Sequence, residues 1–141
     1  MYRDESADIR EVLTKHHTVA VVGASPKPER ASHKVAAFLK DEGFRVIPVT
    51  PKGGQIVGET VYPDLSSIPE PVDIVDVFRR SEDVMPIVEE AIAIGAKALW
   101  LQEEIVNEEA AARAREAGLI VVMDHCMKKE LLRLQGRESE I

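Results

Sequence analysis

Five short apolar runs, rich in valine and isoleucine and separated by longer helical patterns, constrain the fold of this chain most strongly. The runs are Val19–Val22, Val46–Val49, Ile74–Phe78, Ala98–Leu101 and Leu119–Met123. Strands that are apolar on both faces are typical of parallel sheets covered by helices on both sides. The sequence therefore predicts an α/β fold built on a five-stranded parallel sheet.

Helices between these runs complete a doubly wound, Rossmann-like arrangement. Ser32 is the predicted N-cap of the first helix, and Asn107 precedes a later one. Residues 51–71, which are rich in proline and glycine, are predicted to form a loop that replaces one crossover helix. Right-handed crossovers then predict the strand order 3-2-1-4-5, with the runs numbered along the chain.

Length and charge limit the class of protein. The chain has 141 residues, of which 45% are hydrophobic and 30% charged, which is typical of one globular domain spanning residues 1–141. The formal net charge of −7 argues against nucleic acid or an anionic membrane as a partner. The single cysteine, Cys126, indicates a reducing compartment such as the cytoplasm. The first ten residues predict neither a secretory signal nor a membrane span.

The first predicted strand ends in a turn of small residues. Gly23 can turn sharply, and Ala24 and Ser25 are small enough to let a phosphate approach the backbone. The helix that follows directs its free N–H groups and its dipole to the same place, and the turn also carries Lys27 and Arg30. We interpret this turn as a phosphate site. The alternative is a tight strand-to-helix turn without a ligand, which is common in this fold class.

The second predicted strand ends in Thr50, Pro51 and Lys52. An NAD site would have an acidic residue here to hold a ribose hydroxyl, together with glycines in a G-x-G-x-x-G pattern. A lysine instead suits a phosphate on the adenosine ribose, either the 2′-phosphate of NADP or the 3′-phosphate of coenzyme A. Pro51 stiffens the turn. The alternative is that Lys52 is an exposed lysine that is only solvated.

Short motifs spread along the chain carry a family resemblance. They stand at Val22–Ser25, Ser32–Val35, Val49–Pro51, Val72–Arg79, Ala91–Lys97, Trp100–Gln102 and Asp124–Cys126. As a set they resemble the CoA-binding domain of the succinyl-CoA synthetase α subunit. They are still more similar to the small stand-alone CoA-binding proteins built from that domain. The likeness covers nearly all of residues 15 to 134.

This resemblance implies a site for coenzyme A or an acyl-CoA. Ser25 and the loop to Ser32 would hold the pyrophosphate, Lys52 would bind the 3′-phosphate, and the end of the third strand would border the adenosine. The turn that follows the fourth strand would line the path of the pantetheine. The expected cofactor-binding residues are Gly23, Ala24, Ser25, Lys27, Arg30, Ser32, Thr50, Pro51, Lys52, Val77, Arg79, Leu101 and Gln102.

The chain departs from the family pattern in two places. The ligase loop has more glycines than Pro26-Lys27-Pro28, and relatives usually continue Trp-Leu-Gln with a glycine where this chain has Glu103-Glu104. The second departure lies in the turn that would line the pantetheine path, so the pantetheine contacts expected from the family do not carry over directly to this chain.

The sequence predicts no catalytic or metal centre. Asp73 and Asp76 fall on opposite sides of a strand, which makes them a poor acid/base pair. The histidines show no metal-ligand spacing, and Cys126 is either a reactive thiol or a small buried hydrophobic residue. The ligase's phosphohistidine lies in a second domain, before which this chain stops.

We therefore expect a binding module without its own catalytic apparatus, acting as a carrier, a sensor or a partner subunit. A protein partner or a homo-oligomer remains open. The alternative is an NADP-binding oxidoreductase fragment or subunit.

Overall fold

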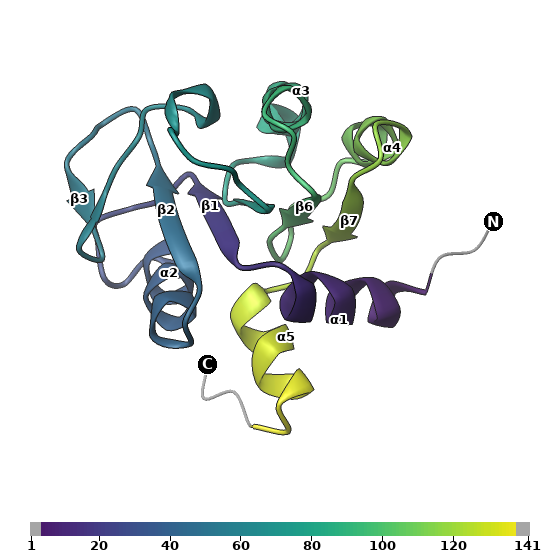
Figure 1. Ribbon diagram of the computed structural model, residues 1–141, viewed down its shortest axis with the longest axis horizontal. Helices are drawn as coiled ribbons and strands as arrows, with labels where there is room; N and C mark the ends of the chain where they lie inside the picture. The colour runs from purple at the N-terminus through teal and green to yellow at the C-terminus, as the bar shows by residue number, and fades with distance from the viewer. Residues whose placement is uncertain (1–3, 138–141) are drawn as a thin grey trace.

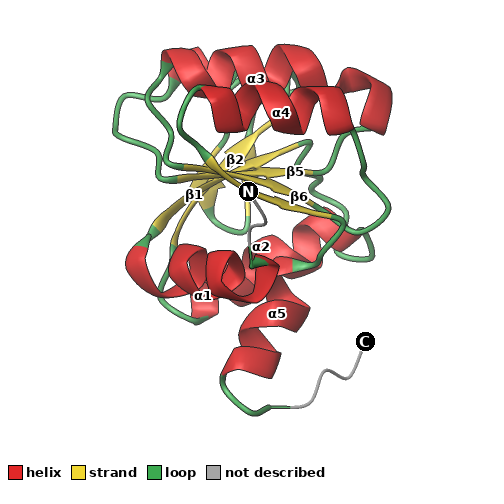
Figure 2. Ribbon diagram, turned by 90° about the vertical axis from the view of Figure 1, so that its right-hand side faces the viewer, coloured by secondary structure: helices red, strands yellow, loops and turns green. Residues whose placement is uncertain are grey.

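The computed structural model describes residues 4–137 and has three layers, with a parallel sheet between two layers of helices (Figures 1 and 2). The strands are β2 (Arg45–Val49), β1 (Thr18–Val22), β5 (Ile74–Val77), β6 (Ala98–Leu101) and β7 (Ile120–Met123), in this spatial order. One face carries α1 (Glu5–Lys15), α2 (Ala31–Asp41) and α5 (Met127–Leu134), and the other carries α3 (Val84–Ala93) and α4 (Glu108–Glu116). The predicted α/β class and parallel sheet are confirmed.

The order of the strands differs from the predicted one. The prediction placed the third run outside the second, whereas β5 pairs with β1 and leaves β2 at the edge, so the runs have the order 2-1-3-4-5. Pro48 in β2 gives the physical reason, because proline has no N–H for a further ladder and is confined to edge strands. Tyr62 lies along that edge, donating to the Pro48 carbonyl at 3.1 Å and accepting from the Thr50 N–H at 3.0 Å.

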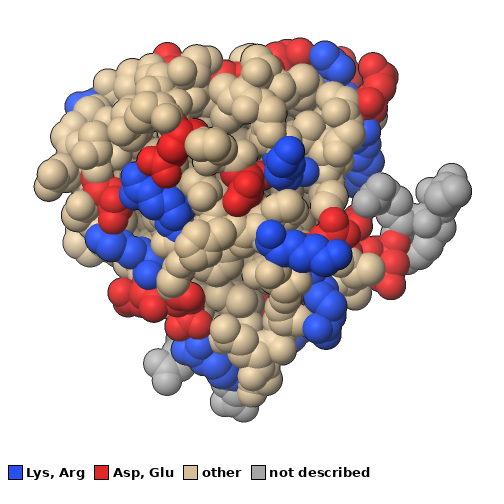
Figure 3. All heavy atoms as spheres, viewed as in Figure 1, with Lys and Arg blue, Asp and Glu red and all other residues tan. Residues whose placement is uncertain are grey.

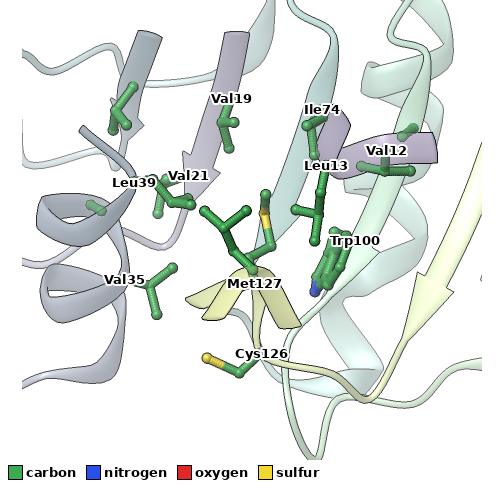
Figure 4. Close-up of a cluster of buried hydrophobic side chains, with 14 of the residues drawn as sticks. Val12, Leu13, Val19, Val21, Val35, Leu39, Ile74, Trp100, Cys126 and Met127 are labelled. Atoms are coloured by element: carbon green, nitrogen blue, oxygen red, sulfur yellow. The ribbon is translucent and has the colours of Figure 1, made fainter. Parts of the chain in front are cut away.

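Two apolar cores fill the spaces between the sheet and its helices, because successive side chains of each strand point to opposite faces. The core beneath α1, α2 and α5 includes Val12, Leu13, Val19, Val21, Val35, Leu39, Ile74, Trp100 and Met127 (Figure 4). The opposite core includes Ala20, Val75, Leu99, Val88 and Ala114. Trp100 is fully buried, so it completes a core layer. None of the described helices is long and apolar enough to cross a membrane.

Hydrogen bonds in the residues just before α2 and α4 determine where these helices begin. Asn107, predicted to precede a helix, accepts from the Ala110 N–H at 2.9 Å and is the N-cap of α4. The prediction that Ser32 caps α2 is wrong, because Arg30 is the N-cap and Ser32 lies in the first turn. A turn closed by the Arg30 N–H and the Lys27 carbonyl at 3.0 Å directs the chain into the helix before Ser32. The Ser32 hydroxyl is therefore not used as a cap.

The segment between β2 and β5 contains a short antiparallel hairpin in place of a crossover helix. The hairpin pairs β3 (Gln55–Ile56) with β4 (Glu59–Thr60) and is followed by a 3₁₀ turn at Leu65–Ser67. Val57 and Gly58 at its tip both have positive φ, +48° and +77°, as a two-residue hairpin turn requires. The predicted irregular connection is confirmed, and its hairpin lies beyond β2 (Figure 1).

A buried carboxyl group lies in the middle of the central strand. Asp76 of β5 is paired in register with Val21 of β1 and Trp100 of β6, and its side chain has no exposed surface. Neither of its carboxyl oxygens has a hydrogen-bond partner among the described residues. Burial raises the pKa of Asp76 well above its usual range. Asp73 is separate from it, since its carboxylate accepts from the backbone N–H groups of His17 and Thr18.

Replacing Asp76 with valine should stabilise the protein. At pH 7 we expect a gain in the free energy of unfolding of about 1.5 kcal/mol, because an unpartnered buried polar group is removed. Since the pKa of Asp76 is raised by folding, the wild type loses stability as the pH rises from the unfolded value toward the folded one. Urea unfolding at pH 4, 6 and 8 should show the gap between Asp76→Val and wild type widening with pH. A constant or narrowing gap would contradict the expectation.

Candidate functional site

A cavity of about 430 Å³ opens at the carboxyl ends of β1, β2 and β5. Its walls come from the turn after β1, the start of α2, the turn after β2, the β3–β4 hairpin and the end of β5. The lining residues are Gly23, Ala24, Ser25, Pro26, Arg30, Ala31, Ser32, Thr50, Lys52, Gly53, Ile56, Phe78 and Arg79. In open α/β sheets, ligands bind in the crevice at this end of the strands.

Gly23 gives the floor of the cavity its shape. It has φ +88°, and a Cβ atom there would lie 2.9 Å from the backbone oxygen of Phe78. The N–H groups of Gly23 and Ala24 both donate to the Val49 carbonyl, at 2.9 and 3.3 Å. The turn therefore holds the ends of β1, β2 and β5 close together, in a conformation that favours glycine.

The start of α2 points to the same cavity. Ala31 and Ser32 lie in its first turn, where backbone N–H groups have no partner within the helix. Ser32 is only 5% exposed, lines the cavity, and has a hydroxyl without a partner among the described residues. The Ser25 hydroxyl accepts from the Lys27 N–H at 3.1 Å and keeps its own hydrogen for donation. Together with the helix dipole, these donors favour an anion.

Three cationic side chains line the cavity near the start of α2. Arg30, Lys52 and Arg79 line the cavity, and within residues 4–137 none of them forms an ion pair. Elsewhere, Arg45 and Arg113 are held by carboxylates at 2.7 to 2.9 Å. In a chain with a net charge of −7, cations gathered without counter-ions indicate that the cavity is suited to a negatively charged ligand.

The face drawn in Figure 3 carries no broad basic surface. On the face drawn in Figure 3, acidic and basic side chains are interspersed. An extended single-sign field, such as a nucleic-acid surface usually presents, is not seen on that face.

The structure brings together most of the residues predicted for the site. Gly23, Ala24, Ser25, Arg30, Ser32, Thr50, Lys52 and Arg79 line the cavity, whereas Lys27, Pro51, Val77, Leu101 and Gln102 do not. Val77 and Leu101 are fully buried within strands β5 and β6. Gln102 follows Leu101 and is nearly buried, and its side-chain oxygen has no partner among the described residues.

Five lining residues were not among the predicted ligand contacts: Pro26, Ala31, Gly53, Ile56 and Phe78. Ile56 comes from the β3–β4 hairpin and Ala31 from the first turn of α2. Gly58 could have indicated that Ile56 lies in a hairpin, because a glycine flanked by short extended segments is typical of a tight hairpin turn. Phe78, directly after β5, is half-buried, packs against the core and also lines the cavity.

Four charged side chains fasten the hairpin to the rest of the molecule, and we call this group the hairpin latch: Lys40, Arg45, Glu59 and Glu70. Arg45 donates to Glu59 at 2.7 Å and, through two nitrogens, to Glu70 at 3.1 and 2.9 Å. Lys40 lies 3.0 Å from Glu59. The hydrogen bond from Lys40 lowers the pKa of Glu59, and that from Arg45 lowers the pKa of Glu70. Both carboxylates are therefore charged at neutral pH.

The described residues include no group of three or more His, Cys, Asp or Glu side chains that could hold a metal ion. Cys126 is buried at 5% exposure and belongs to the core beneath α1, α2 and α5. His125 lies 2.8 Å from Glu5 and 3.5 Å from Glu130. None of these four residues lines the cavity.

Comparison with known protein families assigns the chain to one of them. The sequence profile of the family described as CoA binding domain matches residues 17–131. The chain belongs to the CoA-binding domain family. The matched range begins just before β1 and ends within α5, so it contains the whole sheet and every wall of the cavity.

Proteins of comparable size are similar to this CoA-binding domain over nearly its whole length. YneT of Bacillus subtilis (strain 168) is 40% identical over 128 residues, which are 91% of this chain and 95% of YneT. The solved structure of a hypothetical protein from Pyrococcus horikoshii OT3 has a TM-score of 0.90 at 42% identity, covering 96% of this chain and 98% of the other.

The same domain occurs within larger enzymes. Acetate–CoA ligase (ADP-forming) I of Archaeoglobus fulgidus is 28% identical over 119 residues, which are 77% of this CoA-binding domain but 17% of the ligase. The domain thus corresponds to a small part of such ligases.

Proposed function

We propose that this protein is a single-domain module that binds coenzyme A or an acyl-CoA non-covalently in the cavity above β1. The observation that carries the proposal is the meeting of three unpaired cations with the amino end of α2 in a cavity built from the family's motifs. Each of these features suits phosphate, and coenzyme A carries a pyrophosphate and a ribose phosphate.

The two phosphate groups would occupy different walls. The pyrophosphate would lie at the first turn of α2, where the Ser32 hydroxyl, the Ser25 hydroxyl and free backbone N–H groups can donate. The 3′-phosphate would lie at the turn after β2, beside Lys52. Arg30, the N-cap of α2, and Arg79, which follows β5, can pair with either group.

NADP is the second candidate, because its 2′-phosphate would suit Lys52 equally well. Two observations favour coenzyme A. The turn after β1 reads Gly23-Ala24-Ser25 in place of a G-x-G-x-x-G pattern, and the family to which the chain belongs is described as CoA-binding.

We propose a binding role without catalysis by this chain alone. The cavity lining contains hydroxyl groups and cations, but no histidine, cysteine or carboxylate that could act as a general base. A carrier, a sensor and a partner subunit of an acyl-CoA enzyme are each compatible with such a module.

Isothermal titration calorimetry with coenzyme A, dephospho-CoA, NADP and NAD tests the proposal. We expect coenzyme A to bind most tightly and dephospho-CoA about 30-fold more weakly, because one charge-assisted hydrogen bond is lost. Tighter binding of NADP would favour the second candidate. If none of the four ligands bound, in calorimetry at two temperatures, the proposed function would be wrong.

A further inference from the structure

Two backbone hydrogen bonds, one on each side of the turn that carries Lys52, hold this turn to the rest of the chain. On one side the Thr50 N–H donates to the Tyr62 carbonyl at 3.0 Å, and on the other the Val61 N–H donates to the Gly54 carbonyl at 3.0 Å. Both partners belong to the segment that leaves the β3–β4 hairpin. The position of the turn therefore follows the position of the hairpin.

Within the turn itself, the backbone is closed by a long hydrogen bond, from the Gly53 N–H to the Thr50 carbonyl at 3.5 Å. Gly53 and Gly54 have φ values of +68° and +88°, and a Cβ atom on either would meet nothing within 4 Å. Glycine backbones lose much conformational freedom when they are held in one arrangement. An undocked hairpin would leave Lys52 with many positions, of which few would face the cavity.

The hairpin latch defined above fixes this hairpin from outside the cavity. Arg45 begins β2, so it lies at the opposite end of that strand from Lys52, and it joins Glu59 of the hairpin to Glu70. Lys40, near the end of α2, pairs with Glu59 and donates to the Val57 carbonyl at the hairpin tip at 2.7 Å. None of the four latch residues lines the cavity.

We propose that Arg45 is a positioning residue for Lys52: the hairpin latch holds the Lys52 turn in place and thereby sets the preference for a ligand with a phosphate on its adenosine ribose. This inference rests on the proposed function. Arg45 suits the role because its planar guanidinium binds Glu70 through two nitrogens, a geometry that a lysine cannot reproduce, and Glu59 through the third. By holding the turn before the ligand arrives, the latch removes an ordering cost from binding.

The test is the ratio of the dissociation constants of dephospho-CoA and coenzyme A, measured by calorimetry for wild type and Arg45→Met. We expect Arg45→Met to reduce this ratio about fivefold by weakening coenzyme A alone. In a Lys52→Ala background, Arg45→Met should change the ratio no further. Glu70→Gln, which leaves Arg45 itself in place, should shift the ratio in the same direction and serves if Arg45→Met fails to fold.

Arg113→Met is the matched control. Arg113 is 38% exposed against 39% for Arg45 and donates to Glu89 through two nitrogens, at 2.8 and 3.2 Å, but it lies on α4 across the sheet from α2. It should cost similar stability and leave the ratio unchanged.

An unchanged ratio in Arg45→Met, or an equal loss of affinity for both ligands, would overturn the inference while leaving the proposed function intact. A wild-type ratio near one would overturn the proposed role of Lys52, and the inference with it.

Discussion

Replacing Gly23 with alanine should lower the free energy of unfolding by about 3 kcal/mol and weaken the binding of coenzyme A. Two costs combine: alanine is strained at φ +88°, and its Cβ would lie 2.9 Å from the Phe78 backbone oxygen. Because that neighbour is backbone, relief requires the ends of β1 and β5 to separate. Urea unfolding measures the first effect, and calorimetry measures the second.

Gly95→Ala is the control that separates the cost of backbone strain from the cost of the steric contact with Phe78. Gly95 has φ +78°, but a Cβ atom there would meet nothing within 4 Å. It should therefore cost about 1 kcal/mol through backbone strain alone, without an effect on affinity. Equal losses of stability in the two variants would show that the contact with Phe78 contributes nothing.

Replacing Lys52 with alanine should weaken coenzyme A binding about 30-fold, which corresponds to about 2 kcal/mol for a charge-assisted hydrogen bond. The affinity for dephospho-CoA should hardly change, because that ligand lacks the ribose phosphate. The free energy of unfolding should also be unaffected, since Lys52 is exposed and forms no ion pair within residues 4–137. Calorimetry with both ligands and urea unfolding check the three expectations.

Lys97→Ala serves as the control for net charge. Lys97 is exposed and stands directly before β6, at the opposite end of the sheet from the cavity. It should leave the affinity for coenzyme A within about twofold at moderate salt, because charges beyond a Debye length are screened. If Lys97→Ala and Lys52→Ala weakened binding alike, the effect of Lys52 would be one of overall charge.

The strands and their direction were predictable because the signals are local. Runs such as Val19–Val22 and Ala98–Leu101 are short, rich in β-branched or other large apolar residues and apolar at every position, which is typical of strands covered on both faces. The glycine turn after the first run and the lysine turn after the second were likewise readable, since parallel strands end at the same edge of a sheet. This is why Gly23, Ser25 and Lys52 meet in one cavity.

The strand order was mispredicted even though one local signal was present. Pro48 marks β2 as an edge strand, but proline alone does not say which strand lies on the far side of β1. That depends on where the connection after β2 runs, and the pairing of Tyr62 along the edge of β2 decides it. The position of Ser32 was also misjudged, because the turn between Lys27 and Arg30 starts α2 early.

The sequence by itself determined the alternation of strands and helices, the parallel sheet and the two basic turns, because these follow from residue types at short spacing. Only the tertiary structure decided which strands are neighbours, that Asp76 is buried without a partner, and that Arg45 joins Glu59 to Glu70. These features depend on residues that are brought together from distant parts of the chain. Their energies arise from burial and from charge pairs that exist only once the layers have packed.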